Sequence, residues 1–359
     1  MASTTIEHFV ALQSTVNICA LDLSKAFDEV QHDILFSKLM KRNVPRNFIQ
    51  LLRNWYSNST ICIKWHFCFS HEVKLSAGVR QGGVLSPSLF ALYIDNVLDK
   101  INNSGLGCYI NHICYNAIMY ADDILLISLS VTDLQKMVNI CLFELEHVDM
   151  IVNIKKSVCM RIGKRFNIMA SDIFVGDTPI AWKKELKYLG LQFFAGAKLK
   201  CNIQILRQKY FGAANSIFGK IGTKASPSCY CTLINAHCLP LLTYSLEAIS
   251  LSKSKLGSIA AAYTSGWGKI FGSFDKKVIN ECLFYCGIVP VEIHIDTKKL
   301  GFLDQIACSS HVGLLNLFHI HGKASMLNIM NKYDLRSSES WNTWRLKMWS
   351  VFEQSCHLF

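Results

Sequence analysis

The chain has 359 residues, with 37 Lys and Arg against 26 Asp and Glu, and a net charge of +11. Apolar residues make up 51% of it and charged residues only 18%, which excludes a disordered tail protein because such chains are rich in charge and poor in apolar residues. The length predicts two or three domains.

Cysteine usage predicts an intracellular protein. The sequence has 15 cysteines, an odd number scattered along the chain, and no secretory signal in its first ten residues. Free thiols in a reducing compartment are typical of this pattern, so we expect the nucleus or cytoplasm and no secretion. The most apolar later stretch, residues 231–246, is interrupted by Asn235, His237 and Pro240, so no membrane partner is expected.

The first part of the chain predicts a strand and then three helices. The apolar, partly β-branched run Thr15–Leu21 predicts a strand that ends on Asp22. Helical spacing of apolar residues follows in His32–Met40 and Pro45–Tyr56. Pro87 is suited to the first turn of a further helix.

A hairpin with an acidic tip is predicted next. Two apolar runs, Cys114–Met119 and Ile124–Ser128, flank Tyr120–Asp123. A helix capped by Thr132 should follow. A pair of aspartates at a hairpin tip is also a common turn sequence, so the pair alone is weak evidence of a site.

The second half predicts short strands, including Lys187–Phe193, and an amphipathic helix over Cys201–Ile221. Beyond Ser226 the chain is expected to be mainly helical. Residues 151–220 hold 13 Lys and Arg against 3 acidic residues, a net charge of +10. Such a stripe favours a polyanion partner, with nucleic acid first, although a solvated face of ordinary lysines would look the same.

Five short motifs occur in a fixed order along the first half. They are Leu21-Asp-Leu-Ser-Lys-Ala-Phe-Asp28, Ala77-Gly-Val-Arg-Gln-Gly-Gly-Val-Leu-Ser-Pro-Ser-Leu-Phe90, Tyr120-Ala-Asp-Asp-Ile-Leu-Leu126, Asn153-Ile-Lys-Lys-Ser157 and Tyr188-Leu-Gly190. The set resembles motifs A to E of the reverse transcriptase palm. It is most similar to the non-LTR retrotransposon (LINE) type, near the Jockey-like elements.

The resemblance implies an α+β fold. Residues 1–195 would form a right-hand polymerase palm, an antiparallel sheet with helices on one face, with the fingers mostly missing. Residues 196–225 would form a thumb-like basic helix, and residues 226–359 a mainly helical region of unknown role. Because only 21 residues precede Asp22, we expect an N-terminally truncated product.

The resemblance also implies a catalytic centre with two Mg²⁺ ions, for which Mn²⁺ can substitute. Asp22 and Asp122 would bridge the ions, Asp123 would be an auxiliary acidic residue, and the carbonyl of Leu23 would complete one coordination sphere. Hard cations of this kind prefer carboxylate oxygens and leave positions for phosphates and water. Lys156, or the adjacent Lys155, would protonate the departing pyrophosphate.

Other motif residues would bind the nucleotide substrate. Phe27 matches an aromatic steric gate that crowds a ribose 2′-hydroxyl, although plain core packing is the alternative for a phenylalanine. Gln81, Gly82 and Gly83 match the loop beneath the nascent base pair, where glycines let the backbone approach a substrate. Asp28 is expected to have a local structural role.

The remaining predicted contacts are with nucleic acid. Tyr188, Leu189 and Gly190 resemble the primer grip, a tight hairpin that positions the primer end. Basic residues on and before the amphipathic helix would follow phosphates: Lys198, Lys200, Arg207, Lys209 and Lys220.

The predicted function is RNA-directed DNA synthesis, with an RNA template, a DNA primer and deoxynucleotide triphosphates as substrates. Two alternatives stay open: an inert nucleic-acid-binding remnant of the same element, and a relative of group II intron maturases or retrons. Cys282, Cys286 and His294 loosely resemble a zinc knuckle. They lack a fourth ligand at short spacing, and chance matches are expected in a chain this rich in Cys and His.

Overall fold

A four-stranded antiparallel sheet forms the centre of the first half of the chain in the computed structural model, which describes residues 1–222 and 225–357. Its strand order is β10 (Val158–Gly163), β1 (Thr15–Asp22), β9 (Asp123–Ser128) and β8 (Ala117–Tyr120). The two central strands are almost continuously apolar, as strands buried on both faces are.

Both faces of this sheet are covered. Helices α4 (Ser86–Asn103) and α5 (Val131–Glu146) pack on one face, as the palm prediction required. Helix α1 (Ala2–Ala11) and the later helix α12 (Val312–Leu317) contribute to the apolar cluster on the other face. The α+β palm is therefore confirmed, and the first helix of the chain and the much later α12 help to bury its second face.

The predicted hairpin with an acidic tip is present, since β8 and β9 pair around the turn Ala121-Asp122. The run predicted as one strand, Cys114–Met119, is instead divided at Asn116, which is buried and donates a hydrogen bond to the carbonyl oxygen of Ile101. Its first part belongs to β7 (Ile113–Tyr115), which pairs with β6 (Cys108–Ile110).

The predicted cap of α5 is wrong by two residues. The helix begins at Val131, and Ser130 rather than Thr132 accepts the hydrogen bond from the amide of Asp133. The three predicted helices before it are confirmed: Pro45 precedes α3, and Pro87 lies in the first turn of α4.

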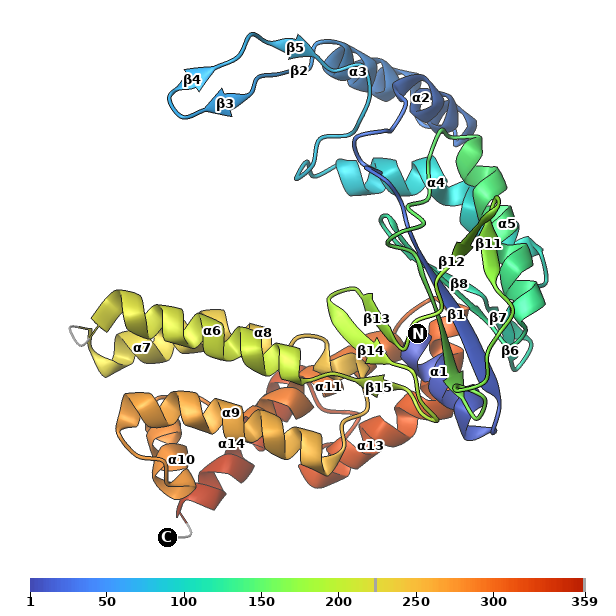
Figure 1. The fold of residues 1–359 in the computed structure, drawn as a ribbon. Helices are drawn as coiled ribbons and strands as arrows, with labels where there is room; N and C mark the ends of the chain where they lie inside the picture. The colour runs from blue at the N-terminus through green and yellow to red at the C-terminus, as the bar shows by residue number, and fades with distance from the viewer. Residues whose placement is uncertain (223–224, 358–359) are drawn as a thin grey trace.

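An arm formed by residues 32–75 extends from the sheet, at the top of Figure 1. Two helices form its base and two small hairpin ladders its end. Its elements are α2 (His32–Lys41), α3 (Arg46–Ser57), β2 (Thr60–Ile61) paired with β5 (Val73–Lys74), and β3 (Lys64–Trp65) paired with β4 (Cys68–Phe69).

A second hairpin connects the sheet to the later helices. Strands β13 (Glu185–Tyr188) and β14 (Leu191–Phe194) pair around Leu189-Gly190, and β15 (Lys200–Cys201) joins β14. The prediction of one strand over Lys187–Phe193 is therefore wrong, because the run folds back on itself at Leu189-Gly190. The tight hairpin of the primer-grip motif is present. A further small ladder, β11 (Ile173–Val175) with β12 (Thr178–Ile180), lies beside α5.

The rest of the described chain is a helical bundle, which confirms the mainly helical prediction. Helix α6 packs with later helices around a second apolar cluster that contains the fully buried Trp267. The helices are α6 (Gln204–Ile221), α7 (Pro227–Leu233), α8 (Leu239–Leu242), α9 (Lys253–Phe271), α10 (Lys276–Tyr285), α11 (Val291–Ala307), α13 (Lys323–Lys332) and α14 (Trp341–His357), with π-helical turns at Ile234–Cys238 and Phe318–Gly322 and a 3₁₀ turn, η3, at Leu246–Ala248.

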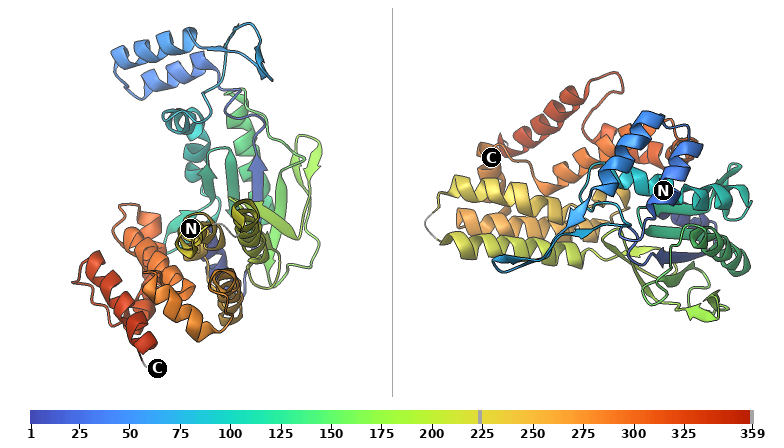
Figure 2. Two further views of the ribbon diagram at one scale, coloured as in Figure 1. Left: turned by 90° about the vertical axis from the view of Figure 1, so that its left-hand side faces the viewer. Right: turned by 90° about the horizontal axis from the view of Figure 1, so that it is seen from above.

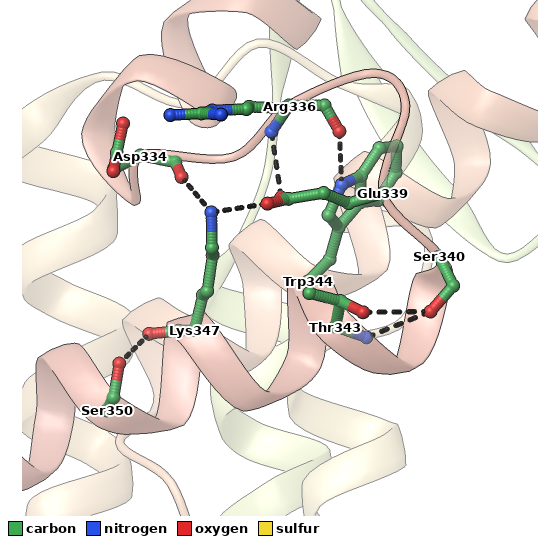
Figure 3. Close-up of polar contacts among 8 residues, drawn as sticks. All are labelled: Asp334, Arg336, Glu339, Ser340, Thr343, Trp344, Lys347 and Ser350. Carbon is green, nitrogen blue, oxygen red and sulfur yellow. Dashed lines mark hydrogen bonds and ion pairs between the residues drawn. The ribbon is translucent and has the colours of Figure 1, made fainter.

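The last helix is held by polar contacts to the loop before it (Figure 3). Lys347 donates from Nζ to the carbonyl oxygen of Asp334, at 2.8 Å, and to Glu339, at 2.6 Å. The indole of Trp344 donates to the carbonyl oxygen of Arg336. The hydrogen bonds that Glu339 accepts from Lys347 and from the amide of Arg336 hold the pKa of its carboxyl below the usual range. Together these contacts fix α14 to the loop before it.

The arm, the sheet and the bundle follow a curved path in Figure 1, with the arm and α6 at its two ends. Seen from above in Figure 2, the arm lies over the bundle. The predicted domain limits at residues 195 and 225 stay a prediction, and residues 223, 224, 358 and 359 lie outside the described residues. No helix among the described residues is long and apolar enough to cross a membrane.

Candidate active site

Two of the three predicted carboxylates lie at paired positions on neighbouring strands of the sheet. Asp22 is the last residue of β1 and is directly opposite Asp123, the first residue of β9. Asp122 lies in the adjoining turn, next to Ala121, whose φ of +51° is unusual for a residue with a side chain. The ladder therefore brings together acidic residues that are far apart in the sequence.

The charges of the other two carboxylates act on Asp123. Burial, and then the negative charges of Asp122 and Asp22, raise the pKa of the Asp123 carboxyl. Oδ2 of Asp22 is buried and accepts no hydrogen bond within the described residues. The ammonium of Lys156 lies 3.7 Å from this oxygen, so the structure places the predicted lysine beside the predicted metal ligand.

A short turn of the fourth motif fixes the backbone of Asp22. The amide of Asn153 donates to the carbonyl oxygen of Asp22, at 2.7 Å, and the amide of Asp22 donates to Oγ of Ser157, at 3.2 Å. Ser157 in turn donates from Oγ to the carbonyl oxygen of Asn153, at 2.8 Å. Asn153 and Ser157 are the first and last residues of the fourth motif, but the sequence predicted no role for either of them.

The carboxylates do not form a preformed metal site. Among residues 1–222 and 225–357, no three Asp, Glu, His or Cys side chains are gathered closely enough to hold a metal ion. The donor chemistry nevertheless suits a hard cation, because a buried carboxylate oxygen without a donor and a carboxyl crowded by like charges would both be stabilised by one.

The predicted nucleotide loop lies against the first motif. Nε2 of Gln81 donates to Oδ1 of Asp28, at 3.1 Å, which agrees with a structural role for Asp28. Gly82 has a φ of +81°, and Gly83 would place a Cβ 2.8 Å from Oγ of Ser86. Glycine is therefore favoured at Gly82 by the backbone conformation and at Gly83 by the close approach of Ser86.

The two other predicted substrate residues are more buried. Leu23 is buried and forms a bridge with Val152. Phe27 is half-buried and stacks on Phe90, with ring centroids 4.8 Å apart. The stacking supports the packing alternative for Phe27, and its role as a steric gate stays a prediction.

The predicted primer-grip hairpin is close to the carboxylates. The hydroxyl of Tyr188 donates to the carbonyl oxygen of Ile118, at 3.5 Å. Burial, and then the charge of Asp123, raise the pKa of Tyr188. Leu189 and Gly190 form the turn of the hairpin, with φ values of +45° and +78°.

The predicted phosphate-binding residues are mostly exposed. Arg207 is the exception: it donates to Gln204 from one terminal nitrogen, and its Nε is buried without a partner in the described chain. Within the described residues none of the five takes part in an ion pair. The exposed ones are Lys198, Lys200, Lys209 and Lys220.

The arm carries exposed aromatic residues that the sequence reasoning missed. Trp65, Phe67 and Phe69 lie on the β3–β4 hairpin, and Phe67 is 97% exposed. Nζ of Lys64 is 5.5 Å from the centroid of the Phe69 ring. The arm is also basic, since residues 41–80 hold seven Lys and Arg against one Glu, and this charge is the sequence signal for a nucleic-acid contact here.

Comparison with known families settles the class of this fold. The family model described as reverse transcriptase (RNA-dependent DNA polymerase) matches residues 3–193, more than half of the chain. The chain belongs to the reverse transcriptase family. All five motifs lie within the matched residues, and the family assignment that they predicted is confirmed.

Reverse transcriptases of retrotransposons are among its relatives. The chain is 31% identical over 195 residues to the Pol polyprotein of the Drosophila melanogaster element R2DM, covering 52% of this chain and 18% of that protein. It is 30% identical over 207 residues to the R2 polyprotein of Bradysia coprophila (54% and 23%) and 25% identical over 187 residues to the jockey polymerase of Drosophila funebris (48% and 19%). The non-LTR assignment is confirmed, and the chain spans less than a quarter of each relative's length.

Telomerases are among the solved structures to which the chain is similar. Apo telomerase from Candida tropicalis gives a TM-score of 0.43 at 14% identity, covering 88% of this chain and 56% of that one. Telomerase from Candida albicans in complex with a TWJ fragment of telomeric RNA gives 0.41 at 13% identity, covering 79% and 49%.

Proposed function

We propose that this chain is an RNA-directed DNA polymerase of a non-LTR retrotransposon. It would transfer a deoxynucleotide from its triphosphate to the 3′-hydroxyl of a DNA primer on an RNA template. The observation that carries the proposal is the pairing of Asp22 with Asp123, with Asp122 beside them, inside the segment that matches the family.

Mg²⁺ is the proposed cofactor, with Mn²⁺ as a substitute. Asp22 and Asp122 would hold two ions with help from Asp123 and the carbonyl of Leu23, and the buried Oδ2 of Asp22 is a fitting ligand because no hydrogen-bond donor occupies it. When bound, such ions lower the pKa of the attacking hydroxyl and neutralise the leaving phosphates.

The side chains around the carboxylates would orient the nucleotide. Lys156 already lies beside Asp22, from where its ammonium could give a proton to the departing pyrophosphate. The half-buried ring of Phe27 would exclude a ribose 2′-hydroxyl. Gln81 is held by Asp28, which fixes the loop on which the new base pair would rest.

The template and primer would lie between the arm and α6. Lys198, Lys200, Lys209 and Lys220 would contact phosphates, giving sequence-neutral binding that weakens with salt. The exposed aromatic rings of the arm suit stacking on unpaired bases, which is tolerant of sequence. All 15 cysteines are free, which supports our proposal of an intracellular site of action, in the nucleus or the cytoplasm.

Primer extension tests the proposal. The purified chain should extend oligo(dT) on poly(rA) with Mg²⁺ or Mn²⁺, and Asp122→Asn should abolish incorporation while leaving binding of the primer–template unchanged. Lys323→Ala, an exposed lysine of α13, is a control that should extend normally.

The alternative is an inert nucleic-acid-binding remnant, and the lysines without ion pairs favour it as the second candidate. It predicts a wild-type chain that incorporates nothing with either metal but still shifts the primer–template in a gel at low salt. That result would overturn the polymerase proposal for this polypeptide.

A further inference from the structure

One tyrosine of the carboxy-terminal region holds the turn of the primer-grip hairpin. Tyr244 follows α8, and its hydroxyl donates a hydrogen bond to the carbonyl oxygen of Leu189, at 3.0 Å. Its ring lies against the other turn residue, because a Cβ on Gly190 would stand 3.3 Å from Cε1 of Tyr244. One side chain therefore contacts both central residues of the turn.

The turn benefits from an outside partner because its backbone is strained. Positive φ values at both central residues match the twist of a two-residue hairpin, but a leucine in that conformation is unfavourable. Leu189 has a φ of +45° and is partly exposed, so its own side chain gives it little support. The hydrogen bond from Tyr244 stabilises the carbonyl orientation that this conformation requires.

Tyr244 is itself fixed by the bundle. The neighbouring Thr243 is fully buried, donates from Oγ1 to the carbonyl oxygen of Leu239, at 2.9 Å, and accepts a hydrogen bond from Nζ of Lys298, at 3.2 Å. Leu246, two residues further on, is buried in the second apolar cluster. The backbone on either side of Tyr244 is thus anchored, while 45% of its own surface is exposed.

The other end of the hairpin is tied to the catalytic sheet. Tyr188 donates to the carbonyl oxygen of Ile118 on β8 and is close enough to Asp123 for that charge to raise its pKa. The hairpin therefore has one attachment at the carboxylates and another, through Tyr244, at the bundle.

We propose that Tyr244 is a positioning residue, which fixes the turn Leu189-Gly190 and thereby places the primer 3′ end at the paired carboxylates. The inference rests on the proposed function and extends it to a residue outside all five motifs. It also gives a role to the region beyond residue 226, for which the sequence predicted none.

Kinetics of a conservative variant test this role. Tyr244→Phe removes the hydroxyl and keeps the ring, so kcat at saturating primer–template should fall about two- to tenfold, as expected for one hydrogen bond. The Kd of the primer–template should stay unchanged, and the Tm should fall by only a few degrees, because one hydrogen bond contributes about 0.5–1.5 kcal/mol. Tyr285→Phe, at a site that is 83% exposed on α10, is the matched control. An active wild type with an equally active Tyr244→Phe variant would overturn the inference.

Crosslinking tests the same role without turnover. A primer that ends in 4-thiothymidine should, on irradiation, attach to the tryptic peptide of residues 188–198. Tyr244→Phe should reduce that yield about twofold or more, given the loss of one hydrogen bond, whereas Tyr285→Phe should not. Equal yields, or attachment of the wild-type chain elsewhere only, would refute the positioning role. A crosslink without primer extension would leave the inference standing and refute the polymerase proposal instead.

Discussion

The hydroxyl of Ser157 allows a quantitative test of how Asp22 is positioned. Ser157→Ala removes the acceptor of the Asp22 amide and the donor to the Asn153 carbonyl oxygen. Ser157 is only 1% exposed, so water has little access to replace these bonds. Two hydrogen bonds of about 0.5–1.5 kcal/mol each predict a loss of about 1–3 kcal/mol in the free energy of unfolding.

The same substitution should slow DNA synthesis. If the activation free energy of incorporation rises by the whole of this loss, because Asp22 is displaced, incorporation slows about five- to 150-fold, since 1.4 kcal/mol is a factor of ten in rate. Urea unfolding gives the stability change, and single-turnover incorporation at saturating primer–template gives the rate.

A control serine separates stability from positioning. Ser252 caps α9 by accepting a hydrogen bond from the amide of Lys255, at 3.3 Å, so Ser252→Ala should reduce stability by about 1 kcal/mol and leave the rate unchanged. If Ser157→Ala is destabilised but as fast as Ser252→Ala, the turn that contains Ser157 does not position the carboxylate and the reasoning fails.

Three further predictions follow from the site. The raised pKa of Asp123 means that the folded state binds its proton more tightly than the unfolded state, so the stability that this proton contributes is lost as pH rises above 3.8. Asp123→Asn should therefore raise the Tm at pH 7 by about 0.5–2 °C, as expected for a half-exposed group, and slow incorporation. An unchanged Tm would contradict this. Phe27→Val should raise incorporation of ribonucleotides relative to deoxynucleotides about tenfold or more, at a loss in stability from its stack on Phe90; a folded variant with unchanged sugar selectivity would assign Phe27 to packing alone. Lys209→Ala should lower the salt slope of primer–template binding by about one, whereas Lys323→Ala should not, and equal slopes would remove Lys209 from the interface.

Local patterns predicted much of the first half. The apolar run that ends at Asp22 and the proline at the start of α4 each specify an element through their own residues. The acidic tip was equally visible, because two apolar runs flank it. That Asp22 and the acidic tip belong to one site came from recognising a set of motifs. The pairing of Asp22 with Asp123 was not predicted, since no local pattern states which strands become neighbours.

Contacts between distant elements were not predictable in this way. Tyr244 contacts Leu189 because the end of a buried helix packs beside a hairpin turn. The sequence of neither segment predicts that the two are neighbours. The division at Asn116 depends on a buried hydrogen bond to α4. The exposed rings at Trp65 and Phe69 were missed for another reason: alternating apolar residues predict a half-buried strand, not an open surface.

The register of β1 against β9 also bears on how the protein folds. Asp22 and Asp123 are separated by roughly one hundred residues, so their pairing requires closure of a long loop, whose entropic cost is met only when non-local contacts form. The two helices of the arm and α4 lie inside that loop and are built from local contacts. They can form during synthesis before residue 123 has left the ribosome, whereas the acidic pair forms only afterwards. The pairing of the two aspartates should therefore form late in refolding, after α2, α3 and α4 have formed.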